Sequence, residues 1–74
     1  MKVKEIIAKQ LKIDESDITD DSQIKYELGI DSLDIMMIIS EIEKEYKINI
    51  DIIELENIET IKDIEELINK KMGR

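Results

Sequence analysis

The sequence contains no cysteine, histidine, proline, tryptophan or phenylalanine. Without cysteine or histidine the chain cannot form a disulfide or a Cys/His zinc site, and it cannot assemble a Ser-His-Asp or Cys-His catalytic arrangement. The reactive side chains that remain are carboxylates, lysines and hydroxyls, which lack the usual general base for neutral pH. If the protein takes part in chemistry, we therefore expect the reactive group to be added from outside.

Aromatic side chains are also scarce, since two tyrosines are the only ones, and the formal net charge is −8. Base stacking is therefore nearly unavailable and phosphate backbones are repelled, so we exclude nucleic acid as a partner. The acidity is concentrated in residues 14–45, which hold eleven acids against two lysines, whereas residues 1–13 carry a net +3. The negative electrostatic potential of these residues would attract basic partners. The alternative interpretation is a solvated acidic surface that only promotes solubility.

The sequence has no apolar run approaching the roughly 18 residues of a membrane span, and its first residues do not have the pattern of a signal peptide. We expect a soluble cytoplasmic monomer with no stable membrane association. Residues 1–74 are predicted to form a single small domain, and the hydrophobic content of 42% predicts an aliphatic, isoleucine-rich core.

Apolar spacing predicts an all-α fold, a small bundle of three main helices plus one short helix. The first helix is expected over residues 3–11 and is followed by a long loop from Asp14 to Asp31. Loops of this length are unusual in small domains and hint at function. The apolar residues expected to anchor the loop are Ile18, Ile24 and Leu28.

The second helix is predicted from Ser32 to about Tyr46, with Asp31 as N-cap and the carboxylate of Asp34 able to reach back in a variant capping box. A short helical turn is expected at 51–57 with Asp51 as possible cap, and the last helix begins at Thr60 with Asp63 at its third position. The expected anchors of the short turn are Ile52, Ile53 and Leu55, and those of the last helix are Ile61, Ile64, Leu67 and Ile68.

The second helix has two apolar faces when residues are placed at about 100° intervals. One face is expected in the core and contains Ile35, Ile38, Ile39, Ile42 and Tyr46. The opposite face keeps Leu33, Met36 and Met37 where polar residues are normal. Exposed methionine and leucine often mark a docking surface. For Met36 the alternative, burial beneath the long loop, stays equally open, whereas docking is favoured for Met37.

Ser32 lies between two carboxylates at the expected start of the second helix, just after Gly29. By spacing alone, it can be an ordinary helix-start residue with no further role. The functional alternative is that Asp31 caps the helix while the Ser32 hydroxyl points outward as a modification site. No base in the chain can activate Ser32, so another enzyme would have to modify it.

The segment from Leu28 to Asp34, with its Leu-Gly-Ile-Asp-Ser-Leu-Asp order and the Ile/Met-rich helix that follows, resembles the discrete, bacterial type II acyl carrier proteins of fatty-acid synthesis. The resemblance covers nearly the whole chain. It includes the acidic loop, the Ile48-Asn-Ile50 approach to the short helix and the Ile58-Glu-Thr60-Ile61 entry to the last helix.

This resemblance implies a carrier and not an enzyme. A phosphopantetheinyl transferase would attach a 4′-phosphopantetheine arm to Ser32, with no metal retained and no catalytic residue, and acyl chains would be carried on the arm's thiol. The candidates for the acyl-chain pocket are Ile35, Ile38, Ile50, Ile58 and Leu67. Fatty-acid-synthesis enzymes with basic patches are the expected partners, and the matching docking positions are Asp31, Leu33, Asp34, Met36, Met37 and Glu43.

The sequence departs from the family pattern where Met37 replaces a common acid, Ser40 a larger apolar residue and Asp51 the usual proline. These departures leave open a carrier for a specialised pathway such as polyketide, aminoacyl or lipid-modifying chemistry. An unmodified helical adaptor that binds through Leu33, Met36 and Met37 is the alternative from a different class.

Overall fold

The computed structural model describes residues 2–73, so the outermost residues of the predicted 1–74 domain, 1 and 74, lie outside the described residues. In chain order the elements are α1 (Val3–Leu11), a 3-10 turn η1 (Glu15–Asp17), α2 (Ser32–Tyr46), α3 (Ile52–Leu55) and α4 (Ile61–Lys71). The described residues contain no strand, which confirms the predicted all-α fold with three main helices and one short one.

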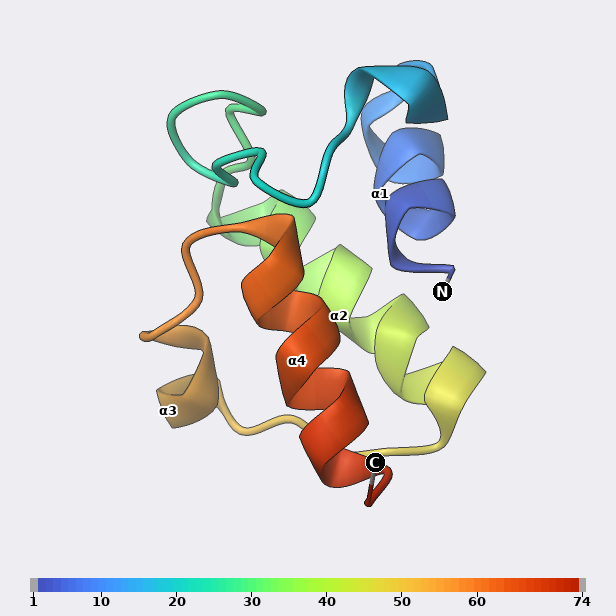
Figure 1. Ribbon diagram of the computed structural model, residues 1–74, viewed down its shortest axis with the longest axis vertical. Helices are drawn as coiled ribbons and strands as arrows, with labels where there is room; N and C mark the ends of the chain where they lie inside the picture. Colours follow the sequence, from blue (N-terminus) through green and yellow to red (C-terminus); the bar gives the residue numbers. More distant parts are fainter. Residues whose placement is uncertain (1, 74) are drawn as a thin grey trace.

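The arrangement places α4 across α2, with α1 and the short α3 on opposite sides of this pair (Figure 1). The long loop between α1 and α2 runs over one end of the bundle and brings the chain to the start of α2. Within residues 2–73, no helix is both long enough and apolar enough to cross a membrane.

Local capping explains where α2 and α4 begin. The Asp31 carboxylate accepts a hydrogen bond from the backbone N–H of Asp34 at 2.9 Å, which confirms Asp31 as N-cap of α2. The reciprocal bond expected from Asp34 is not formed there, whereas α4 has the complete capping box between Thr60 and Asp63. Both α1 and α2 end at a left-handed lysine.

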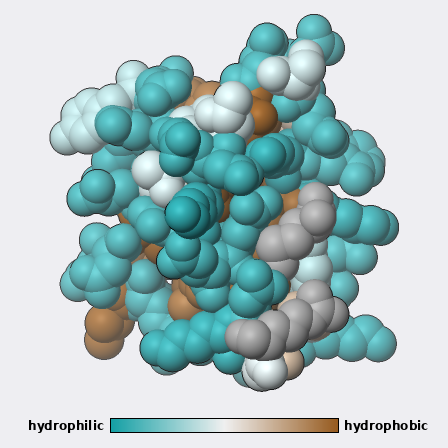
Figure 2. Space-filling view, viewed as in Figure 1, coloured by the Kyte–Doolittle hydropathy of each residue, from teal (hydrophilic) through white to brown (hydrophobic). Residues whose placement is uncertain are grey.

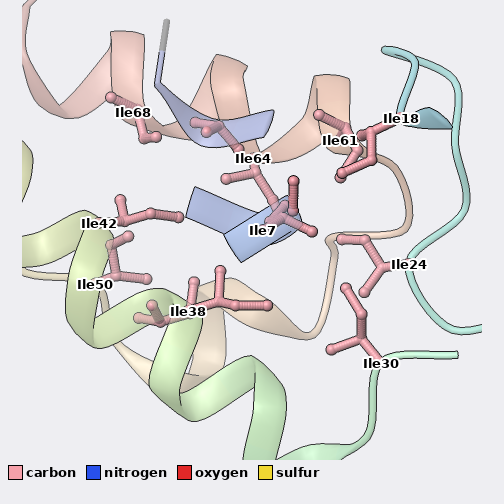
Figure 3. Packing of buried hydrophobic residues seen from close by; sticks show 13 residues of the cluster. Ile7, Ile18, Ile24, Ile30, Ile38, Ile42, Ile50, Ile61, Ile64 and Ile68 are labelled. Atoms are coloured by element: carbon pink, nitrogen blue, oxygen red, sulfur yellow. The ribbon is translucent and has the colours of Figure 1, made fainter. Parts of the chain in front are cut away.

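Isoleucine builds most of the core (Figure 3). Ile7 of α1, Ile38 and Ile42 of α2, and Ile64 and Ile68 of α4 are fully buried, with an exposed fraction of 0%. Each side chain removed from water contributes about 1.5–3 kcal/mol, so this cluster is the main source of stability. The helical stripes predicted from the sequence therefore face the core, with Ile35, Tyr46 and Leu67 only partly buried at its edge.

The α1–α2 loop is held against the start of α4. The backbone N–H of Lys62 donates to the carbonyl of Asp20 at 2.8 Å, and that of Ile24 donates to the carbonyl of Glu59 at 2.9 Å. Ile18 and Ile24 are buried and Leu28 is partly buried, as expected for the anchors, and Ile30 is an additional buried residue. The loop is therefore a fixed structural segment that delivers Ser32 to one place.

The anchors predicted for the short helix are wrong in two of three positions. Ile52 and Ile53 are exposed by 71% and 70%, and only Leu55 packs partly against the core. A helix of four residues has room for one inward position, so consecutive isoleucines at its start cannot all be buried. Figure 2 shows a mostly hydrophilic face with an apolar protrusion over α3, where these two residues lie.

Candidate functional site

The candidate site is centred on Ser32, the first residue of α2. Gly29, with φ of 62°, provides the left-handed backbone that leads into this turn. Because the Asp31 carboxylate caps the helix, the Ser32 side chain is exposed and makes no hydrogen bond to another described residue. The hydroxyl is thus accessible to an enzyme that approaches from solvent.

An open pocket of about 540 Å³ lies directly beside Ser32. Its lining is mainly apolar, and it is bounded by the loop, the first turns of α2 and part of α3 with the residues that follow it. The lining residues are Ile24, Lys25 and Ile30 of the loop, Asp31, Ser32, Ile35 and Met36 at the start of α2, and Ile52, Leu55, Glu56 and Ile58 around α3. A pocket of this size and character suits an apolar ligand that is tethered near Ser32.

The predicted acyl-chain residues divide between this pocket and the core. Ile35 and Ile58 line the pocket. Ile38 and Ile50 are buried in the core, and Leu67 packs against it, so these three are not part of the open lining. Helical periodicity identifies inward-facing residues but does not show which of them border a cavity. The acyl-chain role of this set stays a prediction.

The second apolar face of α2 is exposed. Leu33 and Met36 are exposed by 70% and 59%, so the burial of Met36 beneath the loop is wrong. Met36 borders the pocket, whereas the sulfur of Met37 lies 3.5 Å from the Nε2 of Gln10 in α1. Leu33 and Met36 at the start of α2, together with the exposed Ile52 and Ile53 of α3, form what we call the rim surface; Met36 and Ile52 line the same pocket as Ser32.

Sequence reasoning missed the α3 part of the rim surface because it assigned Ile52 and Ile53 to the core. The available signal was the shortness of the helical segment between Asp51 and Asn57, which leaves little inward surface. The structure brings Ile52 to the same pocket as Ser32, although twenty positions separate them in sequence.

The predicted acidic docking residues have different surroundings. Asp31 is exposed at the helix start, and Asp34 is partly exposed one turn further on. Glu43 is partly buried, and its Oε2 accepts a hydrogen bond from the backbone N–H of Ile50 at 2.9 Å. Its carboxylate therefore holds the segment before α3 in place, and its docking role stays a prediction.

Ion pairs and caps perturb three carboxylates outside the Ser32 turn. A hydrogen bond from Lys4 lowers the pKa of Asp20, and the Lys71 ammonium together with the Asp51 N–H lowers the pKa of Glu54. The backbone N–H groups of Glu59 and Thr60 lower the pKa of Asp63. These carboxylates stabilise the fold and are not placed to activate Ser32.

A second pocket of about 400 Å³ lies between α1 and α2 and has a charged lining that includes Lys2, Glu5, Lys9, Glu41 and Glu45. Apolar cargo would gain little there. Among residues 2–73, no three acidic side chains are grouped so that they could hold a metal ion. The Ser32 pocket is therefore the best candidate for a binding function.

Comparison with known proteins supports this assignment. Residues 2–68 match the family model described as "Phosphopantetheine attachment site". The chain is 40% identical to an acyl carrier protein of Thermotoga maritima over 72 residues, which cover 97% of this chain and 89% of the relative. It is 45% identical to an acyl carrier protein of Onion yellows phytoplasma over 69 residues, covering 93% of this chain and 91% of that relative.

Proposed function

Because the chain belongs to the phosphopantetheine-attachment family of acyl carrier proteins, we propose that it carries acyl groups as thioesters on a 4′-phosphopantetheine arm attached to Ser32. We further propose that residues 1–74 form one carrier domain, that it serves fatty-acid synthesis and that it is not itself an enzyme. The single observation that carries this proposal is the exposed Ser32 hydroxyl beside an apolar pocket.

Attachment requires the Ser32 oxygen to form a bond to the phosphorus of coenzyme A that carries the pantetheine, with release of adenosine 3′,5′-bisphosphate. The proton of the hydroxyl must pass to a transferase, since this chain has no histidine or cysteine to accept it. Asp31 contributes by capping α2, which fixes the position of Ser32 at the surface. When bound, the arm supplies the thiol that the sequence lacks.

The pocket lining favours an acyl chain as cargo. Ile35, Leu55 and Ile58 offer apolar contacts within the same cavity as Ser32. Each methylene group that leaves water contributes about 0.8 kcal/mol, so even a short chain gains several kcal/mol inside. Burial of the chain would also keep it away from other molecules until an enzyme takes it.

Partner enzymes would find the carrier through charge and the rim surface. Asp31 and Asp34 beside Ser32 attract a basic surface, and the net charge of −8 speeds the encounter. Leu33 and Met36 then provide apolar contact next to the attachment point.

Intact-mass measurement tests the proposal. Incubation of the unmodified protein with coenzyme A and a promiscuous phosphopantetheinyl transferase should add one arm. Ser32→Ala should abolish the addition, whereas Ser40→Ala, which alters another exposed serine of α2, should leave it unchanged. An unmodified mass would favour the adaptor hypothesis, and addition to the Ser32→Ala variant would reject the assigned site.

A further inference from the structure

The short helix α3 forms one wall of the pocket beside Ser32. Ile52, Leu55 and Glu56 all line the cavity, although α3 itself spans four residues. Apolar packing holds α3 only weakly, because Ile53 is exposed and Leu55 is only partly buried. A wall with so little buried surface needs a further contact to define its position.

That contact is made by Glu54. Its Oε1 accepts a hydrogen bond from the backbone N–H of Asp51 at 2.9 Å and lies 2.7 Å from the Nζ of Lys71. Glu54 therefore closes the capping box of α3 and joins α3 to the last residue of α4 with the same oxygen. The Glu54 and Lys71 side chains are 29% and 28% exposed, which shields the pair from solvent more than a surface pair.

Comparison with the other ion pairs shows that this one is distinctive. Lys2–Glu45 and Lys44–Glu41 are both separated by 3.7 Å, and most of these side chains are well exposed. Lys4–Asp20, at 2.8 Å, joins α1 to the loop. Within residues 2–73, Glu54–Lys71 is the ion pair that reaches α3.

We propose that the Glu54–Lys71 ion pair is a positioning device that holds the α3 wall against α4 and so limits the length of acyl chain that the pocket shelters. This inference rests on the proposed function. Because an ion pair of this kind changes a local equilibrium by a factor of a few, its loss leaves the global fold intact while α3 opens more often. The pocket then admits longer chains.

Amide hydrogen exchange tests the first half of the proposal on the unmodified protein. The reporters are the N–H groups of Glu56 and Ile58, which bond to the carbonyls of Ile53 and Leu55. We expect Lys71→Met and Glu54→Gln each to speed their exchange about threefold. Glu54→Gln keeps an oxygen for the Asp51 N–H and so removes the charge alone. Lys70→Met removes the same charge at the neighbouring position but no ion pair at short distance, so it should speed the exchange clearly less than Lys71→Met.

Chain-length dependence tests the second half. Acyl-pantetheine groups of increasing chain length would be transferred to Ser32 from acyl-coenzyme A. The melting temperature should rise with each added chain length until the pocket is full, and should then level off. In Lys71→Met and Glu54→Gln the chain length at which the melting temperature levels off should increase. In Lys70→Met it should increase less. The Glu54→Gln/Lys71→Met double variant should shift no further than either single variant.

The outcomes separate this inference from the proposed function. If all variants accept the arm, as shown by intact mass, but exchange at α3 and the levelling length match those of the unchanged protein, the positioning role is overturned and the carrier function stands. If the unchanged protein accepts no arm, the carrier function fails and the pocket-length proposal fails with it.

Discussion

The two sides of the bundle use the same residue type in opposite ways. Between α1, α2 and α4, Ile38, Ile42 and Ile64 are completely buried, whereas on the α3 side Ile52 and Ile53 are about 70% exposed. The first side supplies the packing energy that a domain of this size needs. The second side leaves apolar surface and an open pocket around Ser32. Stability and binding are therefore separated in space, and variants can address them one at a time.

The largest expected loss of stability is on the side packed between α1, α2 and α4, which we call the packed side. Ile64→Ala removes buried methyl groups from α4 and should lower the free energy of unfolding by about 2–5 kcal/mol, because the neighbouring helices cannot fully close the cavity. Ile53→Ala makes the same chemical change on α3 and should alter it by less than about 0.5 kcal/mol. Urea denaturation of the two variants measures the contrast, and equal losses would refute the separation of the two sides.

A smaller loss of stability is expected at the start of α2, where the two sides meet. Asp31→Ala removes the cap and should cost about 1 kcal/mol, since the Asp34 N–H loses its acceptor. Asp31→Asn keeps an acceptor and should retain most of the stability while losing one charge beside Ser32. Thermal denaturation together with the rate of arm addition at low salt measures both properties. A loss of stability as large in Asp31→Asn as in Asp31→Ala would contradict the capping role.

The way in which the stability of the fold changes with pH should be set in part by Asp63. Its pKa is held below the ordinary 3.8 by the N–H groups of Glu59 and Thr60. A carboxylate with a lower pKa in the folded state contributes stability above the unfolded pKa, and that stability is lost as the pH falls through the folded pKa. Asp63→Asn should therefore melt lower at neutral pH and converge with the unchanged protein in acid. Parallel melting curves over that range would show that Asp63 does not contribute.

The smallest effect concerns ionic strength. Residues 14–45 hold nine net negative charges, which repel one another at low ionic strength. Screening at about 0.15 M salt should reduce their repulsion and raise the melting temperature by a few degrees. Divalent ions should act in the same direction. Melting curves at low and moderate salt check this, and identical midpoints would argue against self-repulsion as a cost to the fold.

Much of the helical frame was predictable because local signals and periodicity agree there. The bounds of α1 and α2, the Asp31 cap and the Thr60–Asp63 capping box can all be recognised in the sequence. These helices have apolar stripes, and α2 and α4 also have capping side chains at fixed offsets, so they need little information from the tertiary structure.

The α3 side was less predictable because its properties depend on contacts between distant segments. Sequence reasoning placed Ile52 and Ile53 inside, and it did not anticipate the Glu54–Lys71 ion pair or the bond from Ile50 to Glu43. Ser32 was predicted as the site from its motif, but the cavity beside it requires the loop and α3 to be brought together. No periodic pattern in one segment encodes such a cavity.

Isoleucine methyl NMR tests most directly whether cargo held on Ser32 enters the α3 side, since isoleucines line both regions. Spectra of the arm-bearing protein with and without an octanoyl group would be compared. We predict that the largest shifts occur at Ile35, Ile52 and Ile58, with small shifts at Ile7 and Ile68. Shifts concentrated at Ile7 and Ile68, or none at the pocket residues, would contradict the account.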